Sequence, residues 1–102
     1  MYRAVGVDEY YDIMSTKQFR GIEGTFAAKE FGNDFNETLD FANRSINRDK
    51  VAIIKVTIPE DVYNQLHHMN LDAPIFKSGT PVVEPEMLEY FNNNIISIEH
   101  AF

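Results

Sequence analysis

Residues 51–58 are the segment that most constrains what this chain can fold into. The run VAIIKVTI is rich in β-branched residues, contains no glycine and ends before Pro59, which cannot donate a hydrogen bond to a strand ladder. Residues two apart in a strand share a face, and one face here consists of Ala52, Ile54, Val56 and Ile58. The other face becomes polar at Lys55 and Thr57. This pattern predicts a strand inside a sheet, packed on one face and partly covered on the other.

The composition is that of a folded domain. The 102 residues are 44% hydrophobic and 13% aromatic, which is enough for one modest core, and we predict a single domain over residues 1–102. The chain has no run of about 18 apolar residues, so we expect a soluble protein without a membrane span. No signal-peptide pattern follows Met1. The absence of cysteine excludes disulfides and thiolate chemistry.

The net charge is the second constraint, and it bears on partners. A formal charge of −7 argues against nucleic-acid binding through bulk electrostatics. The nine basic residues are scattered along the sequence. An acidic domain of this kind is either simply well solvated or complementary to a basic protein surface.

The remaining segments alternate between short strand and helix patterns. Asp8 is placed to cap a helix, and a turn at residues 32–34 precedes the clearest helical stripe of the sequence. We expect strands at residues 2–7, 27–31, 81–83 and 95–101, and helices at 9–16, 35–46 and from Glu60 to about His68, with a helical turn at Pro85. Residues 70–80 lack a period and form a long loop. The sequence therefore predicts an α+β fold with a small mixed, largely antiparallel sheet and three to four short helices.

Arg3 and two glutamates are the candidate side chains for ligand binding or catalysis. An arginine inside a short apolar strand either keeps its head in water at a sheet edge or binds an anion or carboxylate bidentately. Glu84 and Glu86 are two apart beside the long loop, so in extended chain both could face one ligand. The alternative is that Glu84 faces solvent and Glu86 stabilises the first turn of the next helix.

The histidines do not form a metal-binding pattern. His67 and His68 are neighbours, so on a helix their side chains would diverge by about 100°. No third ligand lies at a characteristic spacing, and we predict no metal site. The same two residues are typical of a fraying helix end.

The order of these segments resembles a family. The segments are YRAV at the start, a helix ending in KQFR, the GIEG turn, KEF, the helix to Ile46, the IIKVTIP strand and PVVE. Their succession is similar to that of compact ADP-ribosyltransferase-like toxin domains, which lie at the C-termini of large bacterial secreted proteins.

The resemblance implies a function and a set of residues. It implies that Tyr2, Arg3 and Phe31 bind NAD and that Glu84 or Glu86 acts on the ribose. It also implies a protein target or a cognate inhibitor protein, with action in a cytoplasm after delivery within a secreted protein. The sequence departs from the family pattern at residues 32–34, which are not a Ser-Thr-Ser-like stretch, so a diverged, inactive member is an alternative.

Two hypotheses from other classes remain open. One is a non-enzymatic acidic binding module, such as an inhibitor or immunity-type protein, in which Asp34, Glu37 and Asp40 contact a basic partner. The other is a small ribonuclease toxin, which the acidic charge and the lack of a convincing His–Lys pair disfavour.

Overall fold

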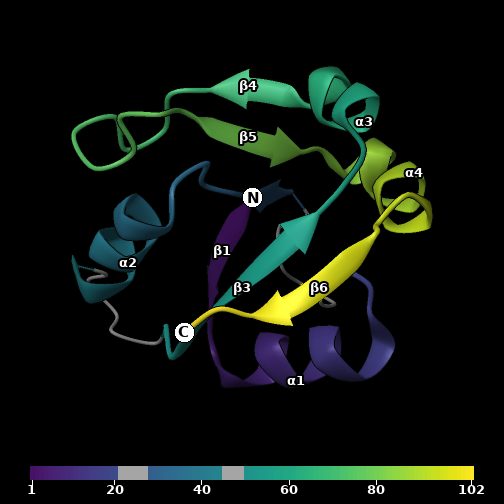
Figure 1. The fold of residues 1–102 in the computed structure, drawn as a ribbon, viewed down its shortest axis with the longest axis horizontal. Helices are drawn as coiled ribbons and strands as arrows, with labels where there is room; N and C mark the ends of the chain where they lie inside the picture. Colours follow the sequence, from purple (N-terminus) through teal and green to yellow (C-terminus); the bar gives the residue numbers. More distant parts are fainter. Residues whose placement is uncertain (21–27, 45–49) are drawn as a thin grey trace.

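The computed structural model describes residues 1–20, 28–44 and 50–102. These residues form an α+β fold of short helices and antiparallel strands, which confirms the predicted class (Figure 1). The elements in chain order are β1 (Tyr2–Val5), α1 (Val7–Thr16), β2 (Lys29–Glu30), α2 (Phe35–Arg44), β3 (Ala52–Thr57), α3 (Glu60–Gln65), β4 (His67–Met69), β5 (Thr80–Val83), the 3₁₀ turn η1 (Pro85–Met87), α4 (Leu88–Asn93) and β6 (Ser97–His100).

The strands form two three-stranded sheets. One has the order β1-β3-β6 and the other β2-β5-β4, and all four pairings are antiparallel. A bridge between Tyr2 and Gly32 joins the sheets: the Tyr2 amide donates to the Gly32 carbonyl at 2.9 Å and the Gly32 amide donates to the Tyr2 carbonyl at 2.8 Å. The end of β2 therefore lies beside the start of β1. In Figure 1, α2 lies on one side of the two sheets and α3 and α4 lie on the other.

β3 is the central strand of its sheet, as its sequence predicts. Ala52, Ile54 and Val56 belong to the core cluster, and Ile54 is fully buried. Ile53 on the opposite face is also buried, whereas Lys55 is exposed. The strand ends at Thr57, two residues before Pro59. The predicted alternation is confirmed, with the second face covered at Ile53 and open at Lys55.

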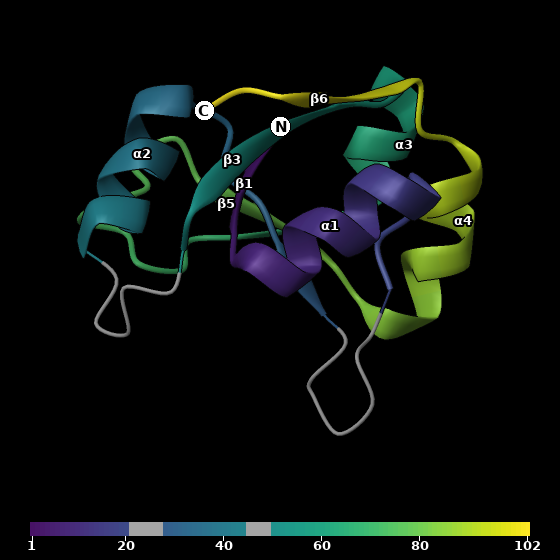
Figure 2. The ribbon, with the colours of Figure 1, turned by 90° about the horizontal axis from the view of Figure 1, so that it is seen from below.

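Three phenylalanine rings form the middle of the core. Phe19, Phe31 and Phe91 are each at most 1% exposed, and their ring centroids are 5.2–5.7 Å apart. The chain after α1 is attached to α4 by Asn92. Its side chain accepts a hydrogen bond from the Phe19 amide at 2.8 Å and donates to the Phe19 carbonyl at 2.9 Å. Figure 2 shows α1 running alongside the sheet that contains β3.

Several predicted boundaries are wrong, each for a local reason. The first strand ends at Val5, because the chain enters α1 at Val7 with Gly6 rather than Asp8 at the N-cap. The helix from Glu60 ends at Gln65, and His67 and His68 belong to β4, where pairing with β5 replaces helical hydrogen bonds.

The last part of the chain also differs from its prediction. Asn92 and Asn93 complete α4, and the strand expected at residues 95–101 covers only Ser97–His100. Ile96 is 65% exposed and does not share a buried face with Ile98. The predicted turn at 21–24 and the predicted helix end at Ile46 lie outside the described residues. In the part of the chain that the structure describes, no helix is long and apolar enough to cross a membrane.

Asn92→Ala should lower the free energy of unfolding by about 1–3 kcal/mol, because it leaves the buried Phe19 amide and carbonyl without partners. Urea denaturation measures the loss. Asn93→Ala is the matched control, since Asn93 is exposed in the same helix. Equal losses of unfolding free energy in the two variants would contradict a structural role for the hydrogen bonds between Asn92 and the Phe19 backbone.

Candidate functional site

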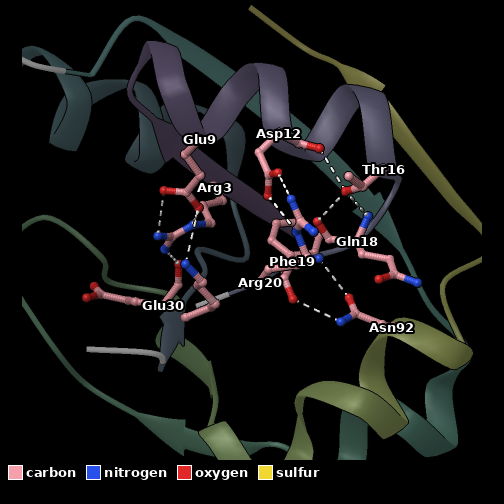
Figure 3. A network of polar contacts seen from close by, with 10 residues as sticks. Arg3, Glu9, Asp12, Thr16, Gln18, Phe19, Arg20, Glu30 and Asn92 are labelled. Carbon is pink, nitrogen blue, oxygen red and sulfur yellow. Dashed lines mark hydrogen bonds and ion pairs between the residues drawn. The ribbon is translucent and has the colours of Figure 1, made fainter. Parts of the chain in front are cut away.

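Arg3 ties β1 to α1 and β2. Its Nε donates to Glu9 Oε2 at 2.6 Å and its Nη2 donates to Glu9 Oε1 at 3.1 Å, a bidentate pair. Its Nη1 donates to the Glu30 carbonyl at 2.8 Å (Figure 3). The guanidinium also lies 5.9 Å from the centroid of the Phe31 ring, within cation–π range. Of the two alternatives for Arg3, the structure shows carboxylate binding, and the carboxylate is that of Glu9 in the same chain.

The charges around Arg3 are partly desolvated. Burial raises the pKa of Glu9, but the hydrogen bonds and charge of Arg3 outweigh it, and the net pKa is below its ordinary 4.5. Lys29 is buried, with its Nζ 3.8 Å from Glu9 Oε2, and burial lowers its pKa. Glu9 is therefore the ionised centre of a small cluster with two cations.

A pocket of about 250 Å³ lies where the two sheets meet. It contains Tyr2, Arg3 and Phe31, the three residues that the resemblance implies for NAD. Its walls come from β1, from the segment containing β2, from α2, and from two residues elsewhere: Tyr2, Arg3, Ala4, Ala28, Glu30, Phe31, Gly32, Thr38, Phe41, Lys50 and Phe76. The lining combines four aromatic residues with three charged ones, so it is more polar than the lining of a typical small-ligand site.

Glu30 is the carboxylate of this pocket. Its Oε1 is the only buried side-chain nitrogen or oxygen among the described residues that has no hydrogen-bond partner. Burial and the negative charge of Asp72 raise its pKa above the ordinary 4.5, although Arg3 and Lys50 oppose the shift. In Figure 3 its side chain extends away from Arg3, whose bond goes to the Glu30 backbone. An unsatisfied, perturbed carboxylate in a pocket marks a functional candidate.

The long loop before β5 supplies one wall of the pocket. Phe76 is 3% exposed, and its ring centroid lies 5.1 Å from that of Phe41 on α2. Glu37 holds the loop against α2, because its carboxylate accepts hydrogen bonds from the Ser78 amide and hydroxyl at 3.0 and 2.9 Å. A Cβ on Gly32 would lie 2.4 Å from Thr38 Oγ1 and 2.8 Å from the Phe76 ring, so the wall is closely packed there.

Glu84 and Glu86 do not line this pocket. Glu84 precedes η1, and its Oε1 lies 3.1 Å from His67 Nδ1. Glu86 is exposed in the first turn after Pro85, as in the alternative weighed from the sequence. The described structure therefore brings Tyr2, Arg3 and Phe31 together without these two glutamates.

The carboxylates of the α2 segment have contacts within the chain. Asp34 Oδ2 accepts from the Glu37 amide at 2.9 Å and caps α2. Asp40 pairs with Arg44 at 2.8 Å. With Glu37 holding the loop, all three acids proposed for a basic partner already have a local role.

Glu30, Thr38, Lys50 and Phe76 are pocket residues that the sequence analysis did not select. In a strand, the Glu30 side chain points to the opposite face from Lys29 and Phe31. This alternation does not indicate which residues pack against the Glu30 face. Phe76 comes from a segment without a period, so no pattern predicts its position.

Within residues 1–20, 28–44 and 50–102, no group of three or more Asp, Glu or His is placed to hold a metal ion. Comparisons with family models, curated proteins and solved structures found no match.

Arg3→Met should lower the free energy of unfolding by about 3 kcal/mol, because it leaves the largely buried Glu9 carboxylate without its main partner. The pair stabilises the protein above pH 4.5 and ceases to do so as pH falls through the lowered pKa of Glu9. Chemical denaturation at pH 7 and pH 3 measures both effects. Arg20→Met is the control, since the Arg20 side chain is 55% exposed in its pair with Asp12, and its effect should be small. A comparable loss in the two variants would contradict the role assigned to Arg3.

Glu30→Gln should stabilise the protein at neutral pH, and the gain should shrink as pH falls. A folded-state pKa above the unfolded one means that native stability decreases as pH rises from 4.5 through the raised value. Glutamine has nearly the same shape and does not titrate. Thermal melts of both proteins from pH 4 to pH 8 measure the difference, with the exposed Glu86→Gln as control. A destabilised Glu30→Gln protein at pH 8 would refute the assignment of Glu30 as an unsatisfied acid.

Proposed function

We propose that the pocket at the junction of the two sheets binds NAD and that the domain is ADP-ribosyltransferase-like, with a macromolecular target. The observation that carries this proposal is that Tyr2, Arg3 and Phe31 line one pocket. They come from β1 and from the residue after β2, so their convergence depends on the Tyr2–Gly32 bridge between the sheets.

Under the proposal, the pocket holds one part of NAD. A volume of about 250 Å³ is below the range of about 300–1,000 Å³ that is typical of small-ligand sites. We therefore propose that only the nicotinamide end enters the pocket and that the rest of the molecule lies along the surface. Arginine has five N–H donors, and the contacts among the described residues use three of those of Arg3. Under the proposal, the other two bind phosphate or ribose oxygens while the Glu9 pair stays intact.

The chemistry implied is transfer of ADP-ribose. The bond between the ribose carbon and the nicotinamide nitrogen breaks, the nucleophile of the target bonds to that carbon and loses a proton, and neutral nicotinamide leaves. The carboxylate in the pocket is Glu30 rather than Glu84 or Glu86. We therefore propose that Glu30 is the acidic group nearest the bound ligand, and that the two later glutamates have other roles.

A second candidate is the acidic binding module, and an asymmetry of charge favours it. Residues 56–102 contain seven Asp and Glu but one lysine, Lys77, and no arginine. Glu60 and Asp61 at the start of α3 and Glu86 and Glu89 in and after η1 are exposed. α3 and α4 lie on the same side of the molecule, where Gln65 donates to the Tyr90 hydroxyl at 3.0 Å (Figure 1). Under this hypothesis a basic protein binds there and NAD does not bind the pocket.

Calorimetric titration with NAD tests the proposal. Wild-type protein should bind NAD, and Lys50→Gln should weaken binding about fivefold, since a lysine at the pocket contributes roughly 1 kcal/mol to holding an anionic ligand. Lys17→Gln, at the distant end of α1, should bind like wild type. Arg3 is left intact because its removal would also damage the fold. No binding by wild type at millimolar NAD would overturn the proposed function, and equal affinities of all three proteins would overturn the proposed site.

A further inference from the structure

We propose that residues 72–79 form a lid that opens as one unit and withdraws the Phe76 ring from the pocket at the junction of the sheets. Opening enlarges the pocket and exposes its walls to solvent. The inference concerns access to the pocket, so it goes beyond the proposed function and does not depend on NAD being the ligand.

The first step of the argument is how little of this loop is buried. The ten residues between β4 and β5 form neither helix nor strand, and Phe76 is the only buried residue among them. Its ring packs against Phe41 on α2, and the loop lies on the α2 side of the molecule (Figure 1). A segment held by a single apolar side chain has the low local stability of segments that open without global unfolding.

The second step is that the polar contacts of the loop with α2 are concentrated at one residue. The Ser78 amide and hydroxyl donate to the Glu37 carboxylate at 3.0 and 2.9 Å, and the Ser78 carbonyl accepts from Asn33 Nδ2 at 2.8 Å. In the part of the chain that the structure describes, these are the hydrogen bonds between residues 72–79 and the segment 33–44. All three are exposed to solvent, so water can replace them when the loop moves away.

The third step is that the loop has internal hydrogen bonds of its own. The amides of Ile75 and Phe76 donate to the Asp72 carbonyl at 2.8 and 2.9 Å, and the Gly79 amide donates to the Phe76 carbonyl at 3.2 Å. These bonds do not involve α2. They therefore remain in place when the loop leaves α2, and the loop moves as one body.

The base of the loop is fixed, which gives the motion a hinge. β4 and β5 are paired as far as Met69 and Thr80, and the Leu71 amide donates to Thr80 Oγ1 at 2.9 Å. Gly79 precedes Thr80 and has a φ of +89°. Glycine changes its backbone angles at little steric cost, so rotation at Gly79 can move the loop while the hairpin stays paired.

The closed loop restricts the pocket. Its volume of about 250 Å³ is below the typical range for small-ligand sites. A Cβ on Gly32 would meet both Thr38 Oγ1 and the Phe76 ring within 3 Å, so Thr38 lies next to the ring in the pocket wall. Thr38 is 1% exposed, and withdrawal of the ring should open it to solvent.

Thiol labelling measures the opening, because the chain contains no cysteine. Thr38→Cys introduces one thiol in the pocket, and Val62→Cys introduces one in the core at α3, where the side chain is also 1% exposed. Without any ligand, iodoacetamide should label Thr38→Cys at a rate that is constant at low urea, since a local opening exposes little surface. The labelling rate of Val62→Cys should rise with urea from the start, since only global unfolding exposes that position.

Removal of the contact between α2 and Ser78 should favour the open state. Adding Glu37→Ala to Thr38→Cys should speed labelling about fivefold, because two hydrogen bonds of the closed state are lost. Asp40→Ala is the matched control, since Asp40 is an acid of the same helix that pairs with Arg44, and it should leave the labelling rate unchanged.

Two results would overturn the lid. One is labelling of Thr38→Cys that rises with urea as steeply as labelling of Val62→Cys, and the other is a rate that Glu37→Ala does not change. Circular dichroism checks the fold of each variant, and Ala4→Cys, 6% exposed in the same pocket, replaces Thr38→Cys should that variant not fold. Because no NAD is present, failure of the lid leaves the proposed function standing, and a lack of NAD binding leaves the lid standing.

Discussion

The contact of Arg3 with Glu9 and Glu30 is the interaction on which the rest of the structure depends. One guanidinium in β1 binds the carboxylate of α1 and a backbone carbonyl of β2, and it lies over the ring of Phe31. The ion pair is mostly shielded from water, so removing either partner would leave a charge that the surroundings cannot solvate. The first two strands and the first helix are held in one arrangement by it, and the pocket is built on that arrangement.

The pocket lies where the two small sheets meet, at the bridge between Tyr2 and Gly32. Tyr2 and Gly32 exchange backbone hydrogen bonds, and the absence of a side chain on Gly32 lets Thr38 and Phe76 approach. The loop that carries Phe76 is long but anchored to α2 through Glu37. The pocket also contains the Glu30 carboxylate, whose Oε1 has no hydrogen-bond partner among the described residues, a feature that reduces stability.

The sequence predicts local structure well where one pattern dominates, as in the β-branched run of β3. It fails at His67 and His68, because their strand conformation depends on pairing with β5, a partner that helix signals do not reveal. For the site, Arg3 is recognisable as a charge in an apolar strand, whereas its partner Glu9 is not, since an acid in the first turn of a helix is common. Phe76 and Glu30 come to line the same pocket through tertiary packing alone.

The most direct test of the central claim is a ¹H–¹⁵N NMR titration of wild-type protein with NAD, followed residue by residue. If the junction of the sheets is the ligand site, the largest shift changes should fall on the backbone amides of Tyr2, Arg3 and residues 30–32. Amides of residues 84–89 should change little. Changes concentrated at residues 84–89, or none at millimolar NAD, would contradict the assignment of the function to this pocket.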